Sequence, residues 1–106
     1  NAVAPGPLNT GMLEEILKAG PKKVGKNFYN QSLKQKKSGG TSFKTVCELI
    51  LFLASKDSDG ISGKLISALW DNWKNWANYK QNLRNSDLYT LRRITGKDRG
   101  FDWGDK

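Results

Sequence analysis

The sequence predicts an α/β fold in which two short strands belong to a parallel sheet and several helices accompany them. Short apolar segments suited to strands occur at residues 2–4 and 64–69, with helical patterns between them. The segment 43–55 is apolar on almost every side, which is typical of a helix buried by more than one neighbour. These elements cannot cover one another, because a parallel sheet needs several strands and two covered faces. We therefore expect the missing partners upstream.

The first strand candidate runs into a loop. It stops at residues 5–7, a Pro-Gly-Pro sequence, because proline cannot continue a ladder of hydrogen bonds. A short amphipathic helix follows, with Thr10 suited to its N-cap and residues 20–21, Gly-Pro, at its end. The loop between strand and helix is a candidate position for a functional site.

A weaker helical pattern covers residues 22–37, which contain few apolar anchors. Residues 38–40, Ser-Gly-Gly, then break the chain. A segment with few buried contacts and glycine at its end is the kind that moves. We expect this stretch to act as a lid.

The second half begins with the apolar helix, for which Thr41 or Ser42 is the expected cap. A turn and the second strand follow, and residues 70–83 have the composition of an α-helix. Aromatic side chains recur there at every third position. On a helix of about 3.6 residues per turn this stripe winds around about half of the cylinder. It therefore predicts a second packing surface, in a larger subunit or in a neighbouring chain. Its members are Trp70, Trp73, Trp76 and Tyr79.

Composition excludes several classes of protein. Histidine is absent, so a Ser-His-Asp triad and a His-ligated zinc site are excluded, and no metal site is expected. The single cysteine, Cys47, fits a reducing compartment, for which the cytoplasm is the expectation. The longest apolar run, 46–54, is far shorter than the roughly 20 residues of a membrane span. The net charge of +8 comes from scattered lysines, so we expect a solvated face and neither a nucleic-acid nor a membrane partner.

Two motifs in this order resemble those of short-chain dehydrogenases/reductases. Residues 1–12 contain Pro-Gly, three further residues and Thr, which is similar to the loop after the family's sixth strand. Residues 48–55 resemble its late helix, which ends in Phe-Leu-Ala-Ser, and 59–66 resemble its Ile-Ser-Gly entry into the last strand. The resemblance covers roughly residues 1–69, and the segment Leu-Arg-Arg-Ile at 91–94 is also similar to one bacterial subgroup. The chain is identified as the C-terminal part of a member of this family.

The resemblance implies a doubly wound parallel sheet of the Rossmann type, with NAD or NADP at the carboxyl ends of the strands. It implies that Pro5 and Gly6 flank the nicotinamide ring, that the Leu8 backbone reaches the carboxamide, and that the Thr10 hydroxyl contacts the carboxamide or the phosphates. These residue types suit the role. Glycine lets a backbone approach a flat ring closely, and a hydroxyl near a helix start assists an anionic group.

The resemblance also divides the chain. Residues 1–106 become part of one Rossmann domain, with a substrate-covering lid at 10–38 and a C-terminal tail at 84–106. The implied substrate is a small alcohol or carbonyl compound, and the implied assembly is a homodimer or homotetramer. The lid supplies four candidate substrate-side residues, Met12, Leu13, Phe28 and Tyr29.

The family's catalytic residues have no counterpart here. A Tyr-x-x-x-Lys pair is absent, since Tyr79 and Tyr89 are followed four residues later by Leu83 and Arg93. Hydride transfer in this family uses that tyrosine as the proton donor, so the fragment alone is expected to be inactive. The substrate, the choice between NAD and NADP and the reaction direction stay open.

The alternative hypothesis is a small basic helical module that binds a protein or a nucleic acid through its Trp-rich helix. The arrangement of the chain discriminates between the two. Neighbouring parallel strands at Val3 and 64–69, with the helix 43–55 packed on them, favour the dehydrogenase. A closed helical bundle with a continuous basic face favours the binding module.

Overall fold

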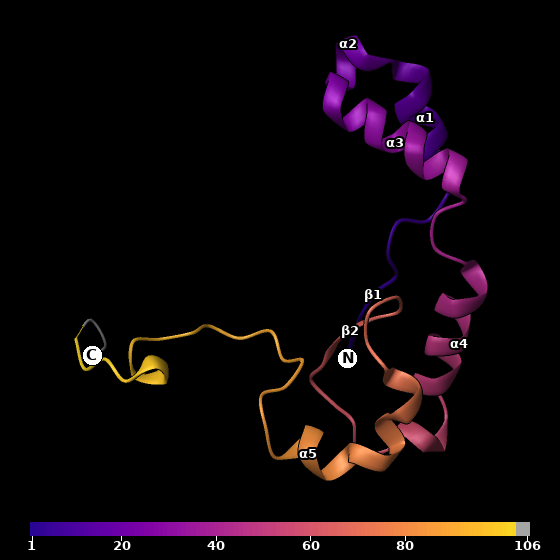
Figure 1. Cartoon of the computed structure of the whole chain (residues 1–106). Helices are drawn as coiled ribbons and strands as arrows, with labels where there is room; N and C mark the ends of the chain where they lie inside the picture. The colour runs from indigo at the N-terminus through magenta and orange to yellow at the C-terminus, as the bar shows by residue number, and fades with distance from the viewer. Residues whose placement is uncertain (104–106) are drawn as a thin grey trace.

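The computed structural model describes residues 1–103, in which helices and two short strands form a mixed α/β architecture (Figure 1). Residues 104–106 of the predicted tail lie outside the described part. Short 3₁₀-helices are labelled η. The elements are β1 (Ala2–Ala4), α1 (Gly11–Ala19), α2 (Pro21–Val24), α3 (Lys26–Ser38), α4 (Phe43–Leu53), η1 (Lys56–Ser58), β2 (Leu65–Ser67), η2 (Trp73–Tyr79), α5 (Lys80–Arg84) and η3 (Lys97–Arg99).

β1 and β2 lie side by side as a parallel pair, although α1 to α4 separate them in the sequence. The Ala2 N–H donates to the Lys64 carbonyl at 2.7 Å, and the Ala68 N–H donates to the Ala4 carbonyl at 3.0 Å. Val3 is paired with Ile66. The predicted parallel neighbourhood of the two segments is confirmed, over a shorter second strand than residues 64–69.

The two edges of this sheet differ in whether their backbone groups are hydrogen-bonded. On the outer side of β2 the Leu65 N–H donates to the Tyr89 carbonyl at 2.7 Å, and the Ser67 N–H donates to Asp71 Oδ2 at 2.6 Å. Backbone groups alternate in direction along a strand, so Val3 directs its amide and carbonyl away from β2. No segment among residues 1–103 hydrogen-bonds there. That edge is open to a further strand.

The core lies between one face of the sheet, α4 and η2. Leu49 of α4 and Ile66 of β2 are both fully buried, at 0% exposure. Val3 and Phe52 pack against them, and the Phe52 ring lies 5.8 Å from that of Trp73. The expected packing of this helix on the two strands is therefore present. The buried cluster consists of Val46, Leu49, Ile61, Ile66, Ala68, Trp73, Trp76 and Leu83.

The other faces of the same elements are bare. Leu65, which alternates with Ile66 and points to the opposite face of the sheet, is 41% exposed. Ile50 and Leu51 on the outer side of α4 are also exposed, the latter at 68%. The sequence predicted burial of this helix on more than one side, and within residues 1–103 only one side is covered.

α1, α2 and α3 pack on one another and form a helical cap that stands apart from the sheet at the carboxyl end of β1 (Figure 1). The single helix predicted for residues 22–37 is wrong. The chain forms two helices because Gly25 adopts a φ of +88°, which is incompatible with helical continuation. Within the cap, Lys36 Nζ contacts Glu14 Oε2 at 2.8 Å.

The α-helix predicted for residues 70–83 is also wrong, because η2 is a 3₁₀-helix and only α5 is α-helical. A 3₁₀-helix has three residues per turn, so side chains three positions apart align along one side. The aromatic period of three thus produces a straight stripe. Trp73 and Trp76 are buried in the core, and the Trp73 Nε1–H donates to the Ala68 carbonyl at 3.3 Å. Trp70 lies outside η2 and is 85% exposed.

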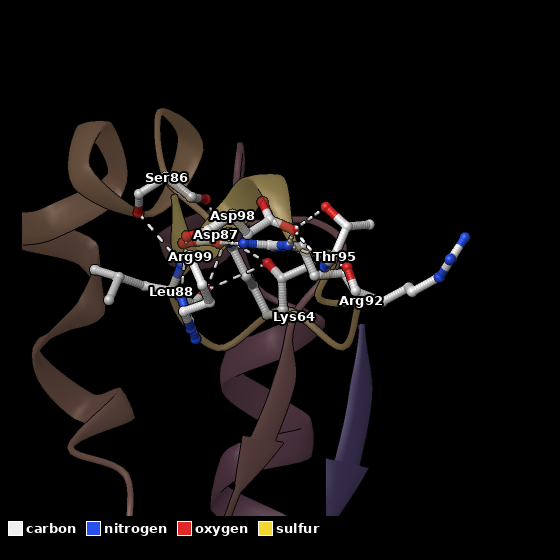
Figure 2. A network of polar contacts seen from close by, with 10 residues as sticks. Lys64, Ser86, Asp87, Leu88, Arg92, Thr95, Asp98 and Arg99 are labelled. Atoms are coloured by element: carbon white, nitrogen blue, oxygen red, sulfur yellow. Dashed lines mark hydrogen bonds and ion pairs between the residues drawn. The ribbon is translucent and has the colours of Figure 1, made fainter. Parts of the chain in front are cut away.

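The tail after α5 is extended and runs away from the body of the molecule (Figure 1). Its start is held by Lys64, whose side chain is only 5% exposed. The Lys64 ammonium donates to the Ser86 carbonyl at 3.1 Å and to the Leu88 carbonyl at 2.9 Å (Figure 2). It also donates to Thr90 Oγ1 at 3.1 Å. All three N–H donors are used, so the lysine fixes this part of the tail to β2.

The overall shape is flat and open. The chain extends over 48 × 42 × 16 Å and has a radius of gyration of 18.7 Å. A compact domain of this length has a radius of about 13 Å. The difference arises because the cap and the tail both project from a small core.

Candidate functional site

The candidate site is the loop of residues 5–10, which links the carboxyl end of β1 to the helical cap. In open α/β sheets, ligands bind outside the carboxyl ends of the strands. Pro5 and Gly6 are exposed, and Gly6 adopts a φ of +79°. Only glycine enters this left-handed region readily, so the sharp turn out of β1 depends on it.

A second segment, residues 39–41, packs tightly against this loop. The Thr41 N–H donates to the Pro7 carbonyl at 2.7 Å. A Cβ added at Gly6 would lie 2.5 Å from Thr41 Oγ1, and one added at Gly40 would lie 2.5 Å from the Pro7 oxygen. Both glycines are therefore needed for the close approach of the two segments.

The Thr41 hydroxyl has an unusual environment. Thr41 is buried, and its Oγ1 has no hydrogen-bond partner among the described residues. The N-cap of α4 is Ser42, so the Thr41 hydroxyl does not cap that helix as one of the sequence alternatives expected. A buried hydroxyl without a partner costs free energy. A polar group of a ligand bound in the loop would remove this cost.

Leu8 and Thr10 occupy the second half of the loop. The Leu8 side chain packs against the core, and its carbonyl accepts from Gln35 Nε2 at 3.1 Å. The same amide lies 3.3 Å from Asn9 Oδ1. Thr10 is the N-cap of α1, but its side chain makes no capping hydrogen bond. The exposed Thr10 hydroxyl is therefore available to a ligand, whereas the Leu8 carbonyl already has one donor.

The four candidate substrate-side residues all lie in the cap but differ in accessibility. Met12 is 72% exposed, Phe28 is half-exposed and Tyr29 is half-buried. Leu13 is only 5% exposed, so its side chain fills the interior of the cap and is not available to a ligand. Of the four, Met12 follows the loop most closely in the sequence.

The loop is suited to binding and orientation and not to proton transfer, because residues 5–10 contain no titratable side chain. The groups whose pKa values are shifted lie elsewhere in the chain. In the tail, the Thr95 amide, the Arg92 guanidinium and the Thr95 hydroxyl lower the pKa of Asp98 from 3.8 to about 2 (Figure 2). Hydrogen bonding to Lys74 lowers the pKa of Glu48 on α4.

Sequence reasoning missed Gln35 and Thr41 as members of this site. Gln35 lies in α3 and Thr41 follows the Gly-Gly break, and both meet the loop through contacts between positions far apart in the chain. Periodicity reports only on neighbours along one element, so it carries no signal for such contacts. The conspicuous pair Gly39-Gly40 next to Thr41 was the available hint of a close backbone approach.

Two further observations concern the protein beyond this site. Within residues 1–103, every helix is too short or too polar to cross a lipid bilayer. Comparison of the sequence with protein-family models and with curated proteins, and comparison of the chain with solved structures, gives no match.

Proposed function

We propose that this chain is the C-terminal part of an NAD(P)-dependent short-chain dehydrogenase/reductase, which interconverts an alcohol and a carbonyl compound. The proposal rests on one observation above all. The loop with the Pro-Gly-x-x-x-Thr sequence follows the carboxyl end of a strand whose neighbour is parallel. This is where a doubly wound sheet binds a dinucleotide.

The open sheet supports the same proposal. β1 has a free edge, β2 has a covered edge, and the sheet face carrying Leu65 is bare. In a doubly wound domain an internal strand has neighbours on both sides and both faces of the sheet are covered by helices. β1 would be internal and β2 would be the edge strand. The doubly wound completion is part of the proposal.

The residues present fit a nicotinamide carboxamide. Pro5 and Gly6 are exposed, the Thr10 hydroxyl has no capping bond, and the Thr41 Oγ1 has no partner among the described residues. Thr10 and Thr41 would donate to or accept from the amide, and Pro5 would flank the ring. The nicotinamide supplies or accepts the hydride when it is bound. The cap would cover the substrate, and Met12 would line its side of the site.

The burial of two tryptophan side chains argues against the alternative of a Trp-rich binding module. Two of the four rings, those of Trp73 and Trp76, are buried in the core and cannot stack on a partner. The chain also forms a strand pair with a packed helix, which was the arrangement expected for the dehydrogenase.

The proposal is tested by titrating the intact gene product with NADH and NADPH and recording nicotinamide fluorescence. We expect saturable binding of at least one of the two, weakened about tenfold in Thr10→Val by loss of one hydrogen bond. Thr45→Val is the matched control, because Thr45 lies in α4 and makes no hydrogen bond to the loop of residues 5–10. Failure of the intact protein to bind either nucleotide would overturn the proposal.

A further inference from the structure

A second pocket lies at the opposite end of the sheet from the loop of residues 5–10. It has a volume of about 320 Å³ and is formed by η2, α5 and residues 88–89. Tyr89 lines this pocket. Its carbonyl accepts a hydrogen bond from the N–H of Leu65, the first residue of β2. The pocket is therefore at the amino end of the strand and separate from the candidate nicotinamide site.

The lining of this pocket is uncharged. All of its side chains are aromatic, aliphatic or amide groups, in a chain with a net charge of +8. Phosphate recognition would call for Lys or Arg in the wall. The pocket therefore favours a neutral ligand.

Aromatic rings form one wall. Trp76 is buried and its ring centroid lies 4.6 Å from that of Tyr89, while Tyr79 and Tyr89 keep about half of their surface exposed. Tyr89 is the single non-glycine residue with positive φ, +55°, among residues 1–103. Lys64 holds the carbonyl of Leu88 and the hydroxyl of Thr90, the residues before and after Tyr89 in the chain. The wall is thus fixed in place before a ligand arrives.

Amide side chains form the polar part of the lining. Asn72, Asn75 and Asn82 line the pocket, and none of their side chains hydrogen-bonds to another described residue. Asn72 and Asn75 are three positions apart, at the N-cap and in the first turn of η2, so they lie on the same side of it. Each amide offers both a donor and an acceptor. A ring of hydroxyl groups, each of which also donates and accepts, matches this set.

We propose that this pocket binds a neutral sugar ring of about one monosaccharide unit. The C–H groups on one face of a pyranose are weakly positive and suit the negative faces of the tyrosine rings. The hydroxyls at its edge pair with the asparagine amides. The three asparagines are exposed, so a purely apolar ligand would displace part of their hydration without replacing its hydrogen bonds. The volume is at the lower end of the range for small-ligand sites.

The test is a titration of the purified protein with D-glucose, D-galactose and N-acetyl-D-glucosamine, followed by the side-chain amide signals of Asn75 and Asn82 in ¹H–¹⁵N spectra. We expect saturable shifts with at least one sugar. Tyr79→Ala and Asn82→Ala should each weaken binding about tenfold. Trp70→Ala should leave it unchanged, because Trp70 is exposed and lies outside the pocket.

Three results would overturn the proposal: no saturable shift with any of the sugars, unchanged affinity in both pocket variants, or binding of cyclohexanol as tight as that of the sugars. The spectra also report whether each variant is folded, and Asn75→Ala replaces any variant that is not. Nicotinamide binding in the intact gene product should be unaffected by Tyr79→Ala, so this test is independent of the proposed function.

Discussion

The residues that shape the candidate site are small ones in a close contact between two segments. Gly6 combines a left-handed backbone with direct contact to Thr41, and Gly40 lies against the Pro7 carbonyl. Such positions tolerate substitution poorly because strain and steric overlap add. Substitutions at three glycines of this chain can separate the effect of backbone strain from that of steric overlap.

Gly6→Ala, Gly20→Ala and Gly11→Ala form a graded series. Gly20 has a φ of +80° with open space around it, and Gly11 has neither restriction. We expect Gly20→Ala to lower the free energy of unfolding by about 1 kcal/mol and Gly6→Ala by more, up to about 3 kcal/mol. Gly11→Ala should be neutral or slightly stabilising. Urea denaturation checks this order, and an equal effect at Gly6 and Gly20 would show that the contact with Thr41 does not matter.

Thr41→Val tests the hydroxyl that has no partner. Valine keeps the shape and removes the buried polar atom, so we expect the free energy of unfolding without ligand to rise by about 1 kcal/mol. The same variant in the intact gene product should bind the nicotinamide nucleotide more weakly, because the hydroxyl is then missing from the site. Destabilisation of the ligand-free protein would mean that the hydroxyl already has a partner.

At the scale of elements, composition and periodicity predicted the positions of the two strands and of α4, although β2 and α4 are shorter than expected, because each has a local signal. β1 ends at proline, and α4 is apolar and follows a Gly-Gly break. One predicted helix boundary and one predicted helix type were wrong, also for local reasons. Gly25 divides α2 from α3 through its positive φ, and the aromatic period of three corresponds to a 3₁₀-helix instead of an α-helix.

Lys64→Met tests the link between β2 and the tail. Methionine fills a similar volume but removes the ammonium that donates to the Ser86 and Leu88 carbonyls and to the Thr90 hydroxyl. We expect a loss of about 2 kcal/mol in the free energy of unfolding, as for a buried hydrogen bond to a charged group. Lys56→Met is the control, since Lys56 is exposed. A comparable small effect in both variants would contradict the assigned role of Lys64.

The tail beyond Tyr89 should loosen in acid. Arg92 contacts Asp87 at 2.6 Å and Asp98 at 3.0 Å, and the pKa values of both carboxyl groups are lowered. A lowered pKa means that the stabilisation is complete above the ordinary value of 3.8 and is lost as the pH falls through about 2.

The amide signal of Thr95, which donates to Asp98 at 2.7 Å, is the probe for this change. We expect it to move to its disordered position over that pH range, and already at neutral pH in Asp98→Asn. Asp102→Asn should behave as the original chain. An Asp98→Asn tail that stays ordered at neutral pH would exclude the network as its cause.

The molecule as a whole has more apolar surface than its own core can cover. The candidate site residues Pro5, Gly6, Leu8 and Thr10 were proposed from a local motif. Their partners Gln35 and Thr41 were not, since contacts between distant segments depend on the assembled fold. The same holds for Lys64 at the other end of the sheet, whose burial has no sequence signature.

Leu51→Ala tests the proposed doubly wound completion of the sheet, in which a further layer covers the exposed side of α4 in a larger protein. Loss of an exposed leucine usually changes the free energy of unfolding by less than about 0.5 kcal/mol, whereas loss of a buried one costs about 2–5 kcal/mol. We expect the intact protein to lose about as much stability in Leu51→Ala as in Leu49→Ala. A negligible effect at Leu51 would mean that no further layer packs on this helix.

The most direct test of the proposed nicotinamide site is the position of the bound nicotinamide ring. The intact gene product, with methyl-labelled leucine and threonine, can be saturated with NADH or NADPH and examined by nuclear Overhauser spectroscopy. We expect contacts from the nicotinamide protons to the methyl groups of Leu8 and Thr10. Nicotinamide contacts confined to residues outside the loop 5–10, or no binding at all, would contradict the account.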